Sequence, residues 1–316
     1  MDRFSLPEEL EEFRGVVRDL TESKIAPRAA EIDATDEWPE DVYHLLVQQD
    51  LMGVGYPEAW GGSGGGALAF GVLIEELSRV SAGVSLTPLV AKLGVIPLVV
   101  AGDTEKAERM TRGIAKGEIL MSYALTEAEA GSDAGGMQTR YRRDGDSFVL
   151  DGTKRFISGA GVSHAYVVFA TRDPSAGTAG ISAFLVMKDD PGVSFGRKED
   201  KMGVRGSPTR EVVLEGCRIP VDRLIGEEGR GFAYAMKTLD QSRPAVGAQA
   251  VGIAQGAFDV AVRYAMEREQ FGKPIADFQL IQAMLADSAT EALACRAMTM
   301  EPTTTNAPRI WSGSST

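Results

Sequence analysis

Apolar residues recur at helical spacing through the first part of the chain. Ser5 followed by Pro7 and Glu8 forms a helix-start signal, and the pattern then begins in PEELEEFRGVVRDLTESKIAPRAAEID. It returns in four more segments separated by Gly or Pro. Apolar residues every three or four positions give a helix one buried face. Residues 1–118 are therefore predicted to form an all-α domain.

From Ile119 the period changes to two. The segments QTRYRRDGDSFVLDGTKRFIS, AYVVFATRD, ISAFLVMKD and REVVLEGCRIP alternate apolar and polar residues between Asp-Gly and Pro-Gly turns. This pattern predicts a middle β-domain of mostly antiparallel strands over residues 119–228. Helical spacing resumes near Gly231 and predicts a C-terminal α-helical domain over residues 229–300.

The order of helices, sheet and helices predicts an α+β protein in which a helical bundle is split by a sheet domain. In the last domain, Pro244 is expected to bend the first long helix, and Gly247, Gly252 and Gly256 predict a face that another helix approaches closely. The final stretch, EPTTTNAPRIWSGSST (301–316), loses all periodicity and predicts an irregular tail.

Charge and hydropathy narrow the choice of partners. The 316 residues carry a formal net charge of −12, and the pI is near 4.8. Nucleic acids and anionic membranes bind positive surfaces, so small molecules or other proteins are the expected partners. The longest apolar stretch, LTPLVAKLGVIPLVVAG, contains Lys92 and falls short of the roughly 20 apolar residues that span a bilayer. It predicts a buried helix and no membrane insertion.

Cysteine and histidine are scarce. Cys217 and Cys295 are the two cysteines, and His44 and His164 are the two histidines. This count favours a reducing interior over a disulfide framework and excludes a multi-histidine metal centre. The acidic start, MDRFSLPEELEEF, does not resemble an export signal, so a cytoplasmic location is expected.

Two loop segments of the middle domain carry residues that suit a ligand. ALTEAEAGSD places the hydroxyls of Thr126 and Ser132 among small residues, which lets a flat, acceptor-rich ligand come close. The same residues also suit a plain turn with solvated acids. KRFISGAG offers Phe156 as a stacking surface and Ser158 as a hydrogen-bond donor at a strand end. The alternative interpretation is that Phe156 is an ordinary aromatic residue of the core.

A third segment lies in the C-terminal domain. In YAMEREQFGKPIADFQLIQ, Arg268 and Gln270 precede a Gly-Lys-Pro break, and Gln279 opens the next helix. An arginine beside a helix start suits a pyrophosphate, because the helix N-terminus and the guanidinium both attract anions.

Together these segments resemble the acyl-CoA dehydrogenase family, flavoproteins with an N-terminal helical domain, a middle β-domain and a C-terminal four-helix bundle. Ala-Leu-Thr-Glu-x-x-Ala-Gly-Ser-Asp at 124–133 fits the family's first signature with its spacing intact, and DKMGVRGSPTREVVLEGCRIP and REQFGKPIADFQLIQ are equally typical. The resemblance runs from about residue 5 to residue 298. It implies FAD-dependent α,β-dehydrogenation of an acyl-CoA thioester to a trans-2-enoyl-CoA, a step of β-oxidation, with an electron-transferring flavoprotein as oxidant.

The resemblance also implies roles for single residues. The implied FAD contacts are Thr126, Ser132, Phe156, Ser158, Arg268, Gln270, Phe271 and Gln279. The implied substrate contacts are Ser132, Asp240 and Arg243. Thr126 would lie at the pyrimidine edge of the flavin, and Phe156, where the family often has Trp, against the isoalloxazine. In the related tetramers the matches to Arg268 and Gln270 reach the FAD of a neighbouring subunit, which implies a homodimer or homotetramer that shares its cofactor.

The catalytic base does not fit this picture. The family places a glutamate either in a helical segment beyond residue 316 or at the position held here by Ser242, and this sequence has neither. The bundle also lacks its last helices. We therefore expect binding of FAD and acyl-CoA with little or no turnover from these residues alone.

Several alternatives remain at this stage. A catalytically inactive subunit could complete the FAD site of a longer partner, and a truncated or frameshifted product is a further possibility. Flavin monooxygenases and nitroalkane oxidases share the architecture, but the pair Asp240 and Arg243 favours a CoA ligand.

Overall fold

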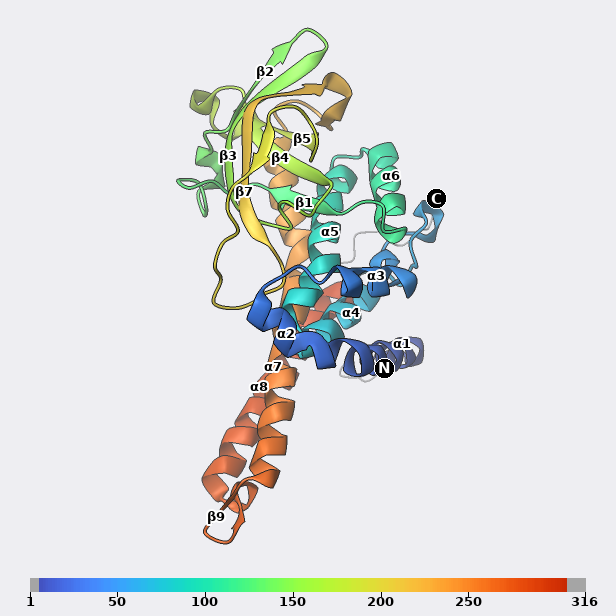
Figure 1. Ribbon diagram of the computed structural model, residues 1–316. Coiled ribbons are helices and arrows are strands. Elements are labelled where there is room, and N and C mark those ends of the chain that lie inside the picture. Colours follow the sequence, from blue (N-terminus) through green and yellow to red (C-terminus); the bar gives the residue numbers. More distant parts are fainter. Residues whose placement is uncertain (1–5, 306–316) are drawn as a thin grey trace.

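Residues 6–305 are described by a computed structural model, in which a helical body, a β-domain and a long helical hairpin follow one another (Figure 1). The helices of the body are α1 (Glu8–Leu20), α2 (Ala26–Thr35), α3 (Glu40–Gln48), α4 (Gly66–Val80), α5 (Ala82–Val100) and α6 (Thr104–Ala115), with a π-helical turn at Thr21–Ile25. Helix α1 begins directly after Pro7, and its first turn is acidic, which suits the positive end of the helix dipole. These helices confirm the all-α start of the α+β fold.

Helix α5 is the buried helix predicted from the longest apolar stretch. Fully buried Val95 and Leu98 lie on it, and the Lys92 ammonium donates a hydrogen bond to the Gly55 carbonyl over 2.7 Å. Within the described residues, α5 and α7 (Gly231–Glu267) are long and apolar enough to cross a membrane by length and composition, and 83% of the α5 window is buried inside the protein. Helix α5 is therefore the central core helix of the helical body.

The middle segment forms the predicted sheet. Its strands are β1 (Met121–Ala124), β2 (Arg140–Asp144), β3 (Ser147–Ser158), β4 (Ala165–Thr171), β5 (Ile181–Met187), β6 (Val193–Phe195), β7 (Thr209–Pro220) and β8 (Leu224–Ile225). The strand order is β6-β7-β3-β2-β4-β5-β8, and β1 pairs with β4. Only the β1–β4 and β2–β4 pairings in this sheet are parallel, which confirms the mostly antiparallel domain.

The C-terminal segment is a helical hairpin. It consists of α7, the short strands β9 (Glu269–Gln270) and β10 (Lys273–Pro274), and α8 (Gln279–Thr305). Helix α7 runs through Pro244 without interruption. It lies beside the sheet and the helical body at least as far as Gly256, which packs against Arg79 of α4. Its last turns and the first part of α8 project away from both (Figure 1).

The expected start of the irregular tail is wrong. Helix α8 continues past Met300 to Thr305, although Pro302 and three threonines are poor helix formers. Adding residues to a helix that already exists costs far less than nucleating one, so weak formers can extend its end. The rest of the predicted tail, residues 306–316, lies outside the described residues.

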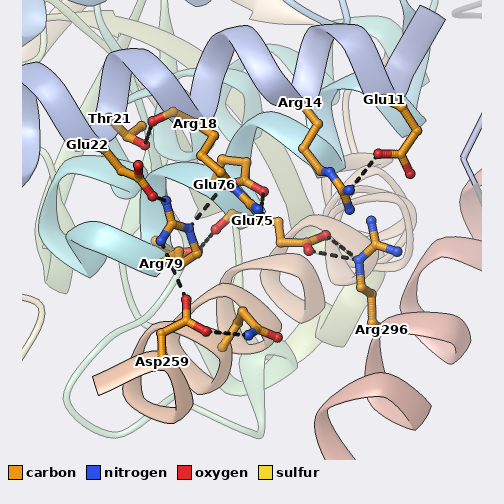
Figure 2. Close-up of polar contacts among 12 residues, drawn as sticks. Glu11, Arg14, Arg18, Thr21, Glu22, Glu75, Glu76, Arg79, Asp259 and Arg296 are labelled. Atoms are coloured by element: carbon orange, nitrogen blue, oxygen red, sulfur yellow. Dashed lines mark hydrogen bonds and ion pairs between the residues drawn. The ribbon is translucent and has the colours of Figure 1, made fainter. Parts of the chain in front are cut away.

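A buried ionic cluster joins the hairpin to the helical body (Figure 2). The Glu76 carboxylate on α4 is fully buried and accepts hydrogen bonds from Arg18 on α1 and from Arg79. Beside it, Glu75 accepts from Arg296 of α8 at 2.8 and 3.0 Å. Helices α1, α4 and α8 are thus held together by charge-assisted hydrogen bonds.

A second group of polar contacts, around Asp36, joins the β-domain to the helical body. Asp36, which follows α2 in a left-handed conformation (φ 54°), accepts a 2.8 Å hydrogen bond from the Gly206 amide and lies 3.2 Å from the Lys198 ammonium. Both partners belong to the segment between β6 and β7. Near the end of that segment, the Pro208 carbonyl accepts a hydrogen bond from the Gly159 amide, directly after β3. The segment therefore connects Asp36 to the end of β3.

Candidate active site

The ALTE segment leaves the sheet at the end of β1 and is anchored from inside. The Glu127 carboxylate is buried and accepts the backbone N–H groups of Gln138 (2.6 Å) and Thr139 (3.0 Å), which closes the loop onto its own far end. Glu129, by contrast, is exposed. Of the two glutamates, only Glu129 therefore fits the interpretation of solvated acids in a plain turn.

Thr126 lies at the start of this loop, directly against β3. Its carbonyl accepts a 2.8 Å hydrogen bond from the Arg155 amide, and its side chain is half-buried. Ser132 is exposed farther out on the same loop. The loop and the strand are therefore fixed to each other next to Thr126.

Phe156 projects from a bulge in β3. The pairing of β3 with β7 shifts register between Lys154 and Ile157, and Phe156 has a left-handed backbone (φ 58°). The residue is 56% exposed, and the Arg155 guanidinium carbon lies 5.2 Å from the ring centroid. The alternative that Phe156 is a core aromatic residue is wrong, because the bulge turns its ring out of the sheet.

Ser158 follows at the end of the same strand. Its carbonyl accepts a 2.7 Å hydrogen bond from the Ser122 hydroxyl, which also lies 2.8 Å from the hydroxyl of Ser163. Within residues 6–305, the side-chain hydroxyls of Thr126 and Ser158 have no hydrogen-bond partner, and both residues are half-buried. Two open donors and a projecting aromatic ring suit a flat ligand rich in acceptor atoms.

The implied substrate contacts Asp240 and Arg243, and Ser242 between them, lie in the half of α7 nearer the sheet. Asp240 and Arg243 are exposed and form an ion pair with each other across one turn. The Ser242 hydroxyl donates a 3.0 Å hydrogen bond to the Leu239 carbonyl within the same helix. The ion pair is open to a ligand, and Ser242 offers only a hydroxyl.

The remaining predicted residues are at the far tip of the hairpin. Arg268, Gln270, Phe271 and Gln279 are all exposed, and Phe271 is 94% exposed with φ 54°. The β9–β10 tip lies at the opposite end of the chain's long dimension from β3 (Figure 1). A single chain therefore does not bring these residues to Thr126 and Phe156.

The sequence analysis missed a buried ion pair beneath the loop. The Lys154 ammonium lies 2.7 Å from Glu127 and is fully buried. Burial lowers the pKa of Lys154 to about 8 although Glu127 opposes that shift. Burial alone would raise the pKa of Glu127, but Lys154 and the neighbouring hydrogen bonds bring it below its ordinary value. A lysine inside the alternating β3 pattern was the available signal.

Known proteins match this chain along nearly all its length. Family models for the acyl-CoA dehydrogenase N-terminal, middle and C-terminal domains match residues 7–118, 122–217 and 229–306. The probable acyl-CoA dehydrogenase FadE25 of Mycobacterium tuberculosis is 48% identical over 297 residues, which cover 94% of this chain and 76% of that protein. The acryloyl-CoA reductase (NADH) of Anaerotignum propionicum is 42% identical, with 93% and 75% covered.

A solved structure agrees with these matches. The butyryl-CoA dehydrogenase of Megasphaera elsdenii superposes with a TM-score of 0.92 at 36% identity, covering 97% of this chain and 81% of that one. Fold and sequence therefore point to the same set of relatives.

Proposed function

The chain belongs to the acyl-CoA dehydrogenase family, and from this we propose that it catalyses α,β-dehydrogenation of an acyl-CoA thioester to the trans-2-enoyl-CoA. It is by membership an oxidoreductase acting on CH–CH groups, with FAD as cofactor. The observation that carries the proposal is the 2.8 Å hydrogen bond between the Arg155 amide and the Thr126 carbonyl. It fixes the loop bearing Thr126 beside the bulge bearing Phe156.

The residues of this chain fit one side of FAD. The open hydroxyls of Thr126 and Ser158 would donate to acceptor atoms of the isoalloxazine, and Phe156 would stack against it. When bound, FAD supplies the hydride acceptor of the reaction. The chain's part is to hold the flavin and the thioester together and to keep water away from them.

Substrate recognition is proposed for the exposed helical turn Asp240–Arg243. The two side chains are paired with each other and exposed, so a ligand can replace solvent around them at little cost. Together with Ser132 they would hold the CoA thioester, as the family resemblance implies. A base must then remove the α-proton while the β-hydrogen leaves as hydride.

Ser242 cannot be that base, because its hydroxyl is held by the helix carbonyl of Leu239 and has no basic form near neutral pH. This observation favours a second candidate function for residues 1–316, a flavin- and CoA-binding subunit without turnover of its own. The chain spans about three quarters of the length of FadE25.

A second copy of the chain is proposed to complete the FAD site. The hairpin tip presents Arg268, Gln270, Phe271 and Gln279 to the outside, far from the chain's own Phe156 (Figure 1). The hairpin also exposes large apolar side chains that a homo-oligomer would cover: Val246, Ile253, Val260, Tyr264 and Met266 on α7, and Leu280, Met284, Leu293 and Met298 on α8. We propose a homodimer or homotetramer in the cytoplasm, with an electron-transferring flavoprotein as oxidant.

The test compares the unmodified chain with Ser242→Glu, and with Ser242→Gln as a control of equal size without a base. Each purified protein is loaded with FAD and mixed anaerobically with acyl-CoA thioesters of increasing chain length. If the second candidate function is correct, the unmodified chain and Ser242→Gln shift the visible flavin spectrum without bleaching it. Ser242→Glu should bleach the flavin at least about ten-fold faster, since a positioned base typically contributes about 10²–10⁴-fold.

A well-folded oligomer that cannot be loaded with FAD would contradict both candidate functions. Rapid bleaching by the unmodified chain would show that another acid acts as base, which would support dehydrogenation by this chain and contradict the second candidate function.

A further inference from the structure

The ion pair Glu127–Lys154 occupies a specific place in the proposed flavin site. Glu127 follows Thr126 in the loop, and Lys154 lies two residues before Phe156 in β3. The Lys154 side chain is fully buried and that of Glu127 is 8% exposed. Both groups therefore lie within the protein, beneath residues that face outward.

The pair holds three stretches of backbone together. The Lys154 ammonium donates to the Glu127 carboxylate over 2.7 Å and to the Leu125 carbonyl over 3.1 Å. The Glu127 carboxylate in turn accepts the amides of Gln138 and Thr139 at the far end of the loop. One buried pair thus fixes the start of the loop, its end and strand β3.

Stability alone does not account for such a pair. Burying two charges costs solvation that their mutual attraction barely offsets, and apolar residues of similar volume often stabilise a protein equally well. What an apolar pair cannot provide is directed hydrogen bonds to three backbone partners at the two ends of the loop. The pair is therefore suited to fixing geometry.

We propose that Glu127 and Lys154 are positioning residues of the flavin site, which set the spacing between the Thr126 loop and the Phe156 bulge. The inference rests on the proposed placement of FAD against these two elements. Neither side chain needs to touch the cofactor. Their loss should loosen the two surfaces that grip it, while leaving the surrounding sheet folded.

The experiment separates positioning from stability. Lys154→Met and Glu127→Gln each leave one buried charge unpaired, so both are expected to lower stability and FAD affinity together. The double variant Glu127→Gln/Lys154→Met leaves no unpaired charge. It should regain most of the thermal stability while the Kd for FAD stays at least about ten-fold above that of the unmodified protein. The visible circular dichroism of the bound flavin should change as well.

Glu75→Gln is the matched control, because Glu75 is also a buried acid paired with a base, Arg296, but lies between α4 and α8. It should lower thermal stability and leave the FAD Kd and the flavin spectrum unchanged. The inference is overturned if the double variant binds FAD as tightly as the unmodified protein, or if Glu75→Gln weakens FAD equally. Failure of the unmodified protein to bind FAD would instead refute the proposed function.

Discussion

At the scale of single residues, Phe156 has an unfavourable backbone conformation, and it lies in the proposed flavin site. Bulky residues rarely adopt a left-handed backbone, which costs about 1–2 kcal/mol per residue. Phe156 nevertheless has φ 58°, and the residue is 56% exposed, so packing does not compensate the strain. A strained residue that projects an aromatic surface is better explained by a ligand than by stability.

Phe156→Gly tests this explanation. Glycine relieves the strain but loses more entropy on folding, so the free energy of unfolding should change by less than about 1 kcal/mol. The Kd for FAD should rise by up to about ten-fold, since an aromatic stacking contact is worth about 0.5–1.5 kcal/mol. Urea unfolding and fluorescence titration with FAD measure the two quantities.

Val204→Gly is the control for that substitution, because Val204 also has a left-handed backbone (φ 54°) but lies in the segment between β6 and β7. It should resemble Phe156→Gly in stability and keep the FAD affinity of the unmodified protein. Equal loss of affinity in both variants would show that backbone strain, and not the ring, matters for the cofactor.

At the scale of elements, glycines decide how α7 packs on α4. A Cβ atom at Gly252 would lie 2.2 Å from the Glu75 carbonyl oxygen, and one at Gly256 would lie 2.1 Å from the Arg79 carbonyl oxygen. Such contacts are impossible without moving a helix. The close helix approach predicted from these glycines is confirmed.

Gly252→Ala should therefore destabilise the protein by about 1–3 kcal/mol, because extra volume in a tight interface forces backbone shifts. Gly15→Ala is the matched control, since Gly15 lies inside α1 with nothing within 4 Å of the added Cβ. It should stabilise the protein by up to about 1 kcal/mol through helix propensity. Thermal unfolding of both variants checks the opposite signs, and a stabilising Gly252→Ala would refute tight packing of α7 on α4.

The elements that could be predicted from the sequence are those with a local signal. The hydrophobic period predicted the helical and β regions, whereas the ligand loop expected from the small residues beside Thr126 stays a prediction. The bulge at Phe156 and the inward turn of Glu127 were not predictable, because both depend on how β3 pairs with β7 and how the loop folds back. The end of α8 was not predictable from the low helix propensity of its last residues, because those residues extend a helix that already exists.

At the scale of the whole molecule, the proposed FAD contacts lie in two distant places, the β-domain and the tip of the helical hairpin. The Arg268 backbone is held on both sides, by its amide bonded to the Tyr264 carbonyl and by its carbonyl bonded to the Ile275 amide, each over 2.8 Å. Its guanidinium has no hydrogen bond or ion pair within the part of the chain that the structure describes. A rigid tip with an unused cation suits an anionic group supplied from outside, such as the pyrophosphate of a FAD bound to a second copy.

Subunit complementation tests that arrangement. Arg268→Ala should weaken FAD by about 1.5–3 kcal/mol, whereas Arg142→Ala, which removes an exposed arginine of β2, should leave binding unchanged. Mixing Arg268→Ala with Phe156→Gly and reassembling the oligomer gives hybrids. If each site combines Phe156 of one chain with Arg268 of another, one site in a hybrid pair is intact and its sister carries both lesions. Random pairing then restores tight FAD binding in about one quarter of all sites. If both residues acted within one chain, every site would keep a lesion, and the mixture would bind FAD no better than the average of its two components.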